Sequence, residues 1–159
     1  MSEATTEQLT PWLGDTEMTA WRAYIVGSAL LEHRLNRELQ LSHGLSIADY
    51  EILVSLSEVP DMRMRMSELA AGIAHSKSRM SHQIRRLERE GLVRRQECPE
   101  DGRGVLAALT DKGMAKLREA APSHVQGVRE HMIDLLEPDE QKTLGEIFTR
   151  LTGHLRSIE

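Results

Sequence analysis

Hydrophobic side chains recur every three or four positions over much of this chain, the spacing that places them on one face of an α-helix. The first such segment covers residues 16–41 and is longer than the core of a small protein needs. Gly44 is expected to end it, and Ser46 offers the side-chain oxygen that begins a second helix, which reaches about Glu58, just before Pro60. This part of the chain therefore predicts two helices, the first of them long and amphipathic.

A helix-turn-helix is expected next. Residues 66–74 form a short helix and residues 76–90 a second one, with the serine at its start as the N-cap. Met80, Ile84 and Leu87 share one face of the second helix. Because those three side chains turn toward a core, the serine, histidine and arginine side chains on the opposite face are available to a partner.

The remainder of the chain predicts a β-hairpin and two more helices. Residues 92–97 and 105–110 have the pattern of short strands joined by a turn that contains Pro and Gly. Residues 111–135 form a helix that Pro122 bends, and residues 138–156 form a final helix whose apolar stripe needs a partner. The predicted fold class is mainly α with a small β-hairpin wing, a winged helix-turn-helix with additional helices.

Charge is distributed unevenly along the chain. The net charge is −5, yet residues 75–95 contain seven Lys or Arg and two Glu, a net +5 that leaves −10 for all other residues. A protein with one face that meets phosphates needs such segregation to stay soluble and avoid nonspecific adhesion. A solvated helix face is the alternative explanation for a charge run taken alone. The helix-turn-helix and hairpin around this run favour the phosphate-binding explanation.

Composition excludes several classes of protein. Aromatic residues make up 3% of the chain, so an aliphatic core with many Leu and eight Met is expected. The single cysteine, Cys98, excludes an intrachain disulfide and is expected to fill the base of the hairpin. The first residues are acidic and polar, unlike a secretory signal, and no apolar run approaches the roughly 20 residues of a membrane span, so we expect a cytoplasmic protein with no membrane partner. No nucleophile with an adjacent base stands out, and we expect no enzyme activity.

The second helix of the helix-turn-helix carries side chains suited to base edges in the major groove of B-DNA. Arg79, His82 and Arg86 are the expected base readers, because Arg bridges O6 and N7 of guanine. The side chains near the helix start, where free amides and the positive end of the dipole favour a phosphate oxygen, are Ser76, Lys77 and Ser78. Double-stranded DNA is therefore the expected partner.

The hairpin adds a second expected DNA contact. Arg103 lies between two glycines at the tip, placed to enter a narrow minor groove. Asp101 either holds Arg103 through a charge-assisted hydrogen bond or caps the turn, and both readings stay open. The complete expected DNA-binding set is Ser76, Lys77, Ser78, Arg79, Ser81, His82, Arg85, Arg86, Asp101 and Arg103.

Taken in order, these motifs resemble the MarR family of winged helix-turn-helix transcriptional regulators. The matching stretches are 67–70 (Ser-Glu-Leu-Ala), 76–87, 91–93, 101–103 (Asp-Gly-Arg), 109–110 and Gly113. The resemblance implies one unit over residues 1–159, made of a winged helix-turn-helix DNA-binding lobe over 46–110 and a helical dimerisation lobe over 16–45 and 111–159. It also implies a ligand-responsive repressor that binds a pseudo-palindromic operator as a homodimer.

Two positions depart from the family's pattern. Arg65 stands where the family often has a capping Thr or Ser, and Arg cannot supply a capping oxygen, so either Ser67 caps the short helix one turn late or that helix frays. Family members that sense peroxides resemble one another in an N-terminal cysteine, whereas the cysteine here is Cys98, beside the wing. Thiol sensing of that kind is not expected.

Other candidate sites leave alternatives open. Trp12, Trp21 and Tyr24 either line a pocket for a small aromatic effector, as the resemblance suggests, or pack in the core or a dimer seam, which we favour. His124 and His131 share a helical face, but a zinc site needs three or four convergent ligands, and we expect no metal or other cofactor. The rival functions are a helical dimeric protein-interaction module and a small-molecule-binding protein without sequence-specific DNA binding.

Overall fold

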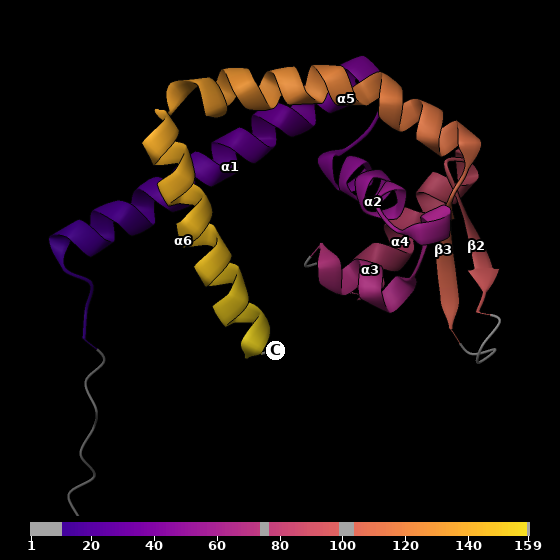
Figure 1. Cartoon of the computed structure of the whole chain (residues 1–159), viewed down its shortest axis with the longest axis horizontal. Helices are drawn as coiled ribbons and strands as arrows, with labels where there is room; N and C mark the ends of the chain where they lie inside the picture. Colours follow the sequence, from indigo (N-terminus) through magenta and orange to yellow (C-terminus); the bar gives the residue numbers. More distant parts are fainter. Residues whose placement is uncertain (1–10, 74–76, 99–103, 159) are drawn as a thin grey trace, which may run out of the picture.

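The computed structural model describes residues 11–73, 77–98 and 104–158, without the side chain of Lys77. The elements, in chain order, are α1 (Asp15–His43), α2 (Ile47–Ser57), the 3-10 turn η1 (Pro60–Met62), β1 (Arg63–Arg65), α3 (Met66–Gly72), α4 (Lys77–Arg89), β2 (Val93–Glu97), β3 (Val105–Leu109), α5 (Asp111–His131), the 3-10 turn η2 (Ile133–Leu135) and α6 (Pro138–Ser157). Figure 1 shows α2, α3, α4 and the strands gathered at one end of the molecule, with α1, α5 and α6 extending from it. The expected helices and both expected wing strands are present.

The sheet has one strand more than the sequence predicted. Its order is β1-β3-β2, and both pairings are antiparallel. The additional strand, β1, places Met64 opposite Ala107. It covers the edge of β3 that would otherwise be unpaired, which leaves a compact three-stranded wing.

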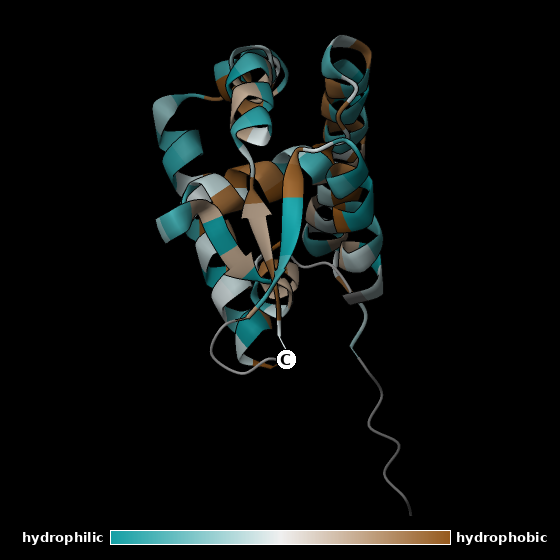
Figure 2. Ribbon diagram, turned by 90° about the vertical axis from the view of Figure 1, so that its right-hand side faces the viewer, coloured by the Kyte–Doolittle hydropathy of each residue, from teal (hydrophilic) through white to brown (hydrophobic). Residues whose placement is uncertain are grey.

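A single hydrophobic cluster holds the winged helix-turn-helix together. Figure 2 shows hydrophobic positions concentrated where the helices meet the sheet, with hydrophilic residues on the outward faces of the helices. The fully buried side chains of this cluster include Ile52, Leu53 and Leu56 of α2, Leu69 of α3, Met80, Ile84 and Leu87 of α4, and Ala107 of β3. The core is aliphatic, as the composition predicted.

Local capping fixes where the second helix begins. Gly44 ends α1 with a left-handed backbone, φ 67°. The Ser46 Oγ accepts a hydrogen bond from the Asp49 amide, while the Asp49 carboxylate accepts one from the Ser46 amide, so the two residues form a capping box. By contrast, α3 begins after Arg65 with no side-chain cap, the absence that the sequence predicted.

Helices α1 and α5 form a closely packed seam. Leu35 and Leu39 of α1 are buried against α5. A Cβ atom at Gly127 of α5 would lie 2.6 Å from a Glu38 carboxylate oxygen, so glycine allows this approach. The His131 Nε2 lies 2.8 Å from the Glu38 Oε1 and adds a polar contact across the same seam. Helix α5 continues through Pro122 and Figure 1 shows it bending, as expected.

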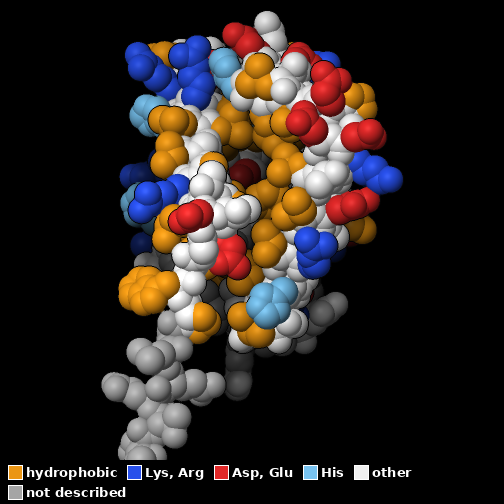
Figure 3. Space-filling model, turned by 90° about the vertical axis from the view of Figure 1, so that its left-hand side faces the viewer, with side chains coloured by type: hydrophobic (Ala, Val, Ile, Leu, Met, Phe, Trp, Pro, Cys, Tyr) orange, Lys and Arg blue, Asp and Glu red, His pale blue; other side chains and the backbone are white. Residues whose placement is uncertain are grey.

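Helix α6 and the first half of α1 carry apolar side chains that the single chain does not cover. Tyr24 of α1 lies beside Phe148 of α6, with ring centroids 5.5 Å apart. Figure 3 shows hydrophobic side chains lining a hollow in this side of the molecule, with charged side chains along its margins. The exposed apolar residues on these two helices include Trp21, Tyr24, Ile25, Val26, Leu30, Ile147, Phe148, Leu151 and Leu155. Among the described residues, no helix is long and apolar enough to cross a membrane.

Candidate nucleic-acid interface

Helix α4 is divided sharply into a buried and an exposed face. Met80, Ile84 and Leu87 are at most 1% exposed and anchor the helix on the lobe's core. The polar residues that the structure leaves exposed on the other side are Ser78, Arg79, His82, Arg85 and Arg89, while Ser81 is half-buried. A helix held in this way presents one cationic face at a fixed rotation about its own axis.

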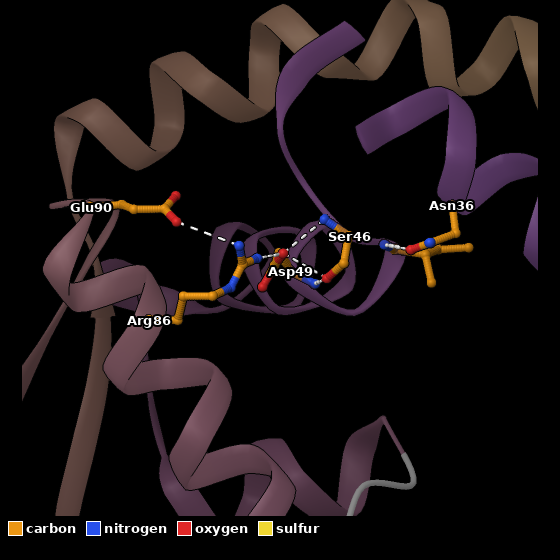
Figure 4. Close-up of polar contacts among 6 residues, drawn as sticks. Asn36, Ser46, Asp49, Arg86 and Glu90 are labelled. Atoms are coloured by element: carbon orange, nitrogen blue, oxygen red, sulfur yellow. Dashed lines mark hydrogen bonds and ion pairs between the residues drawn. The ribbon is translucent and has the colours of Figure 1, made fainter. Parts of the chain in front are cut away.

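Arg86 differs from the other expected base readers. Its guanidinium forms an ion pair with Asp49 of α2, and its Nη1 also lies 3.4 Å from the exposed Glu90 carboxylate. Figure 4 shows the side chain turned back from α4 toward the start of α2. The expectation that Arg86 reads a base stays a prediction, and in this structure the donors of Arg86 face an acid on another helix of the same chain.

Asp49 is the buried charge of this contact. Its side chain is completely buried, and its Oδ2 accepts hydrogen bonds from the Ser46 amide at 2.7 Å and the Ser46 hydroxyl at 2.5 Å. The sequence did not predict Asp49 as a residue of this site. The Ser-x-x-Asp spacing from Ser46 identifies a capping residue, but no local pattern indicates its second partner, Arg86.

The end of α4 is bound to the wing and to the start of α5 by further contacts. The Glu88 carboxylate accepts hydrogen bonds from the Arg95 amide at 3.2 Å and from the Arg95 Nε at 2.8 Å. The Lys112 ammonium donates to the Glu90 carbonyl at 2.7 Å, at the end of the helix where a cation is favoured. These contacts hold α4, β2 and the start of α5 together.

The hairpin base is closed by a backbone hydrogen bond. The Cys98 amide donates to the Gly104 carbonyl at 2.9 Å, and the Cys98 side chain is buried there, which confirms its expected place. The expected site residues Ser76, Asp101 and Arg103 lie outside the described residues, as does the side chain of Lys77. Their expected DNA contacts stay predictions.

A pocket of about 360 Å³ opens at the junction of the helix-turn-helix with α1 and α5. Tyr50 and His124 face each other in it, with ring centroids 4.4 Å apart. Burial lowers the pKa of His124, a lowering that the Glu38 charge partly opposes. Burial, together with the nearby Glu32 charge, raises the pKa of Glu51 on the same pocket wall, while the charge of Arg79 acts in the opposite direction.

The aromatic residues singled out in the sequence lie elsewhere. Trp12 is 94% exposed, and Trp21 and Tyr24 are about half exposed on α1. They are not in the hydrophobic core of the winged helix-turn-helix, and they do not line the pocket beside Tyr50 and His124. Within residues 11–73, 77–98 and 104–158, no group of three or more His, Cys, Asp or Glu side chains is placed to hold a metal ion.

Comparisons with known proteins agree with this architecture. The sequence model of the MarR family matches residues 43–104, the segment that holds α2, the helix-turn-helix and the strands β1 and β2. The HTH-type transcriptional repressor YetL of Bacillus subtilis is 32% identical over 112 residues, which are 69% of this chain and 67% of YetL.

Two solved structures from Streptomyces coelicolor are similar over nearly their whole length. AbsC, a MarR family transcriptional regulator, is 49% identical with a TM-score of 0.87, over 93% of this chain and 99% of AbsC. Sco3205, a MarR family transcriptional regulator solved in complex with DNA, is 44% identical with a TM-score of 0.89, over 93% of this chain and 92% of Sco3205.

Proposed function

The chain belongs to the MarR family of transcriptional regulators, and we propose that it represses transcription by binding a pseudo-palindromic DNA duplex as a homodimer. The observation that carries this proposal is the two-sided α4, whose apolar face is buried while Arg79, His82 and Arg85 line the exposed face. A helix of this kind fits the major groove, where each base pair offers a distinct set of donors and acceptors. Sco3205, at 44% identity, was solved in complex with DNA, which supports the same use of this fold here.

The roles assigned to individual side chains follow from their places. Arg79, His82 and Arg85 are the proposed base-contacting residues, since they are exposed on the outer face of α4. Ser76, Lys77 and Ser78, with the partly buried Ser81, are proposed to contact the phosphate backbone near the start of that helix. Asp101 and Arg103 keep their proposed roles at the tip of the wing, where Arg103 enters the minor groove.

The apolar face of α1 and α6 supports the homodimer. Monomeric proteins rarely expose a continuous apolar surface of this kind, and a second copy of the chain would cover it. A dimer also supplies the geometry of the operator, because two α4 helices about 34 to 36 Å apart enter successive major grooves. The division into a DNA-binding lobe over 46–110 and a dimerisation lobe over 16–45 and 111–159 is part of this proposal, as is a cytoplasmic location where the operator DNA is found.

Regulation by a small ligand is proposed for the pocket beside Tyr50 and His124. A planar aromatic effector would stack on these rings, in a pocket that borders both α2 and α5. A ligand that favours one spacing of the two α4 helices shifts the population toward it by its difference in affinity for the two states.

Selection of bound duplexes from a random pool, at near-physiological salt, tests the proposed function. We expect enrichment of a pseudo-palindrome of about 16 to 20 base pairs, as half-sites one helical turn apart require. Arg79→Ala should then weaken operator binding by about 1 to 3 kcal/mol and relax the preference at one position of each half-site. The matched control is Arg129→Ala, which removes one positive charge from α5, where Arg129 pairs with Asp134.

The outcomes separate the proposal from its rivals. Binding that is equally tight for all duplexes, or no enrichment at all, would favour the protein-interaction module. Tight binding of an aromatic ligand that leaves DNA affinity unchanged would favour the small-molecule-binding protein. Equal losses for Arg79→Ala and Arg129→Ala would remove Arg79 from the base-contacting set.

A further inference from the structure

We propose that Asp49 and Arg86 are positioning residues whose ion pair fixes the angle of α4 against α2. Arg86 then affects DNA binding by holding α4 in place, and it does not touch a base. This inference rests on the DNA-binding function proposed above. It assigns a role to a buried ion pair that lies between the body of the protein and the helix that meets DNA. It also replaces the role in base recognition that the sequence suggested for Arg86.

The carboxylate of Asp49 is held in place by Ser46, at the start of the same helix. Both donors of Ser46, its amide and its hydroxyl, point at Asp49 Oδ2, and no solvent reaches the Asp49 side chain. Arg86 completes this arrangement from α4, with a side chain that is 29% exposed. Charges in such a site are screened far less than charges at the surface, so the contact keeps its strength at physiological salt.

The residue that follows Ser46 is held in turn by α1. The Asn36 Oδ1 accepts a hydrogen bond from the Ile47 amide at 2.9 Å, at the first residue of α2. Figure 4 shows Asn36, Ser46, Asp49, Arg86 and Glu90 following one another from α1 to the end of α4. Because α1 belongs to the proposed dimerisation lobe, these contacts connect the dimer to the helix that meets DNA. They therefore set the separation between the two α4 helices of a dimer as well as the angle of each.

The position of Arg86 along α4 gives the contact mechanical leverage. Arg86 lies in the last turns of the helix, while Arg79 lies about 10 Å toward its other end, at 1.5 Å per residue. A tilt of about 10° about the Arg86 contact would displace Arg79 by roughly 2 Å, which is enough to break a bidentate contact to a base. The other contacts at this end of α4, from Arg95 and Lys112, are exposed to solvent and do not reach α2.

Asp49→Asn tests whether Arg86 positions α4 or contacts a base, because the two roles predict opposite changes in operator affinity. Removing a negative charge from a DNA-binding protein strengthens DNA binding by simple electrostatics, and a base-contacting Arg86 released from its acid would add to that gain. The positioning role predicts the opposite. We expect the operator dissociation constant to rise roughly 5- to 150-fold, the range for losing one bidentate base contact, and the preference for half-site spacing to broaden.

Glu90→Gln is the matched control. It removes a carboxylate from the same guanidinium, but from the exposed side, and leaves the buried pair with Asp49 intact. We expect its operator affinity to be unchanged or slightly higher than that of the wild type. All measurements use the full-length protein at a temperature at which circular dichroism shows each variant folded.

Two further variants extend the test if Asp49→Asn does not fold. Arg86→Lys keeps the positive charge but not the planar fork, so a positioning role and a bidentate base contact both predict loss of affinity, whereas a point contact to phosphate predicts none. Asp49→Asn combined with Arg86→Gln should bind no worse than Arg86→Gln alone, because both changes break one contact.

The results distinguish failure of this inference from failure of the proposed function. If the wild type selects no operator, the proposed function fails and the inference with it. If the wild type binds its operator selectively while Asp49→Asn binds as tightly or tighter, and Arg86→Lys also keeps full affinity, only the positioning role is overturned. Weakened and spacing-tolerant binding by Asp49→Asn, with normal binding by Glu90→Gln, establishes it.

Discussion

Replacing Gly113 by alanine should destabilise the protein, although alanine is the better helix former. Gly113 lies in the first turn of α5, and its amide donates to the Thr110 hydroxyl that caps the helix. A Cβ atom at this position would lie 2.0 Å from the Leu92 carbonyl oxygen and 2.7 Å from a methyl group of Leu109. Contacts this short do not occur in folded proteins, so the backbone would have to separate by at least about 1 Å.

The Leu92 carbonyl cannot move freely. It accepts a hydrogen bond from the Thr110 amide at 3.1 Å and shares the Thr110 hydroxyl, at 3.0 Å, with the Gly91 carbonyl, which lies 2.7 Å from that hydroxyl. Overpacking costs about 1 to 3 kcal/mol, and each weakened hydrogen bond adds about 0.5 to 1.5 kcal/mol. The gain from replacing glycine in a helix offsets about 1 kcal/mol of this sum. At the midpoint of these ranges the net loss for Gly113→Ala is about 3 kcal/mol, a fall in Tm of roughly 6 to 12 °C for a chain of this size.

Thermal unfolding of the two proteins at the same concentration measures this loss, since the stability of a dimer depends on concentration. Gly72→Ala is the control, because a Cβ at Gly72 has no atom within 4 Å. Its Tm should stay within a few degrees of the wild type. An unchanged or higher Tm for Gly113→Ala would refute the argument, because it would mean that the backbone at Leu92 moves away from the new Cβ atom without loss of stability.

Three further predictions concern stability. Burial lowers the pKa of His124, so the unfolded chain binds a proton at this imidazole more readily than the folded one, and the free energy of unfolding falls as the pH drops below about 6.5. His124→Phe should remove that fall when urea unfolding is compared at pH 5.5 and 7.5. An unaltered pH dependence would contradict the prediction. Thr110→Ala should lower the free energy of unfolding by about 1 to 2 kcal/mol through loss of the α5 cap, whereas Thr110→Ser should retain most of it. Asp61 has a left-handed backbone with φ 57°, so Asp61→Gly should raise the free energy of unfolding by about 0.5 to 1 kcal/mol, and a decrease in urea unfolding would show that its ion pair with Arg63 matters more.

The sequence is informative wherever the determining interactions are local. The burial of Met80, Ile84 and Leu87 could be predicted from their helical spacing alone. The start of α2 could be predicted from the capping pattern at Ser46. In both cases the residues that decide the structure lie within one or two helical turns of one another.

Strand β1 could not be predicted in this way. It has three residues, too few to show an alternating pattern, and it exists because Arg63–Arg65 pairs with β3, which lies much later in the chain. The backbone enters this strand through left-handed conformations at Asp61 and Met62, neither of which is glycine. Tertiary pairing with β3 therefore overrides weak local preferences here.

Arg86 shows the same limit at the candidate site. Its spacing relative to Arg79 and His82 is compatible with a shared face, and a helical projection does not distinguish a cation facing DNA from one facing a buried acid. The distinction depends on Asp49. The sequence identifies this residue as part of a capping box, and the fold places its carboxylate against Arg86 of α4. A buried carboxylate requires a compensating partner, and here Arg86 is that partner for Asp49. For this reason the base contacts that we propose for α4 are those of Arg79, His82 and Arg85, which are exposed on its outer face.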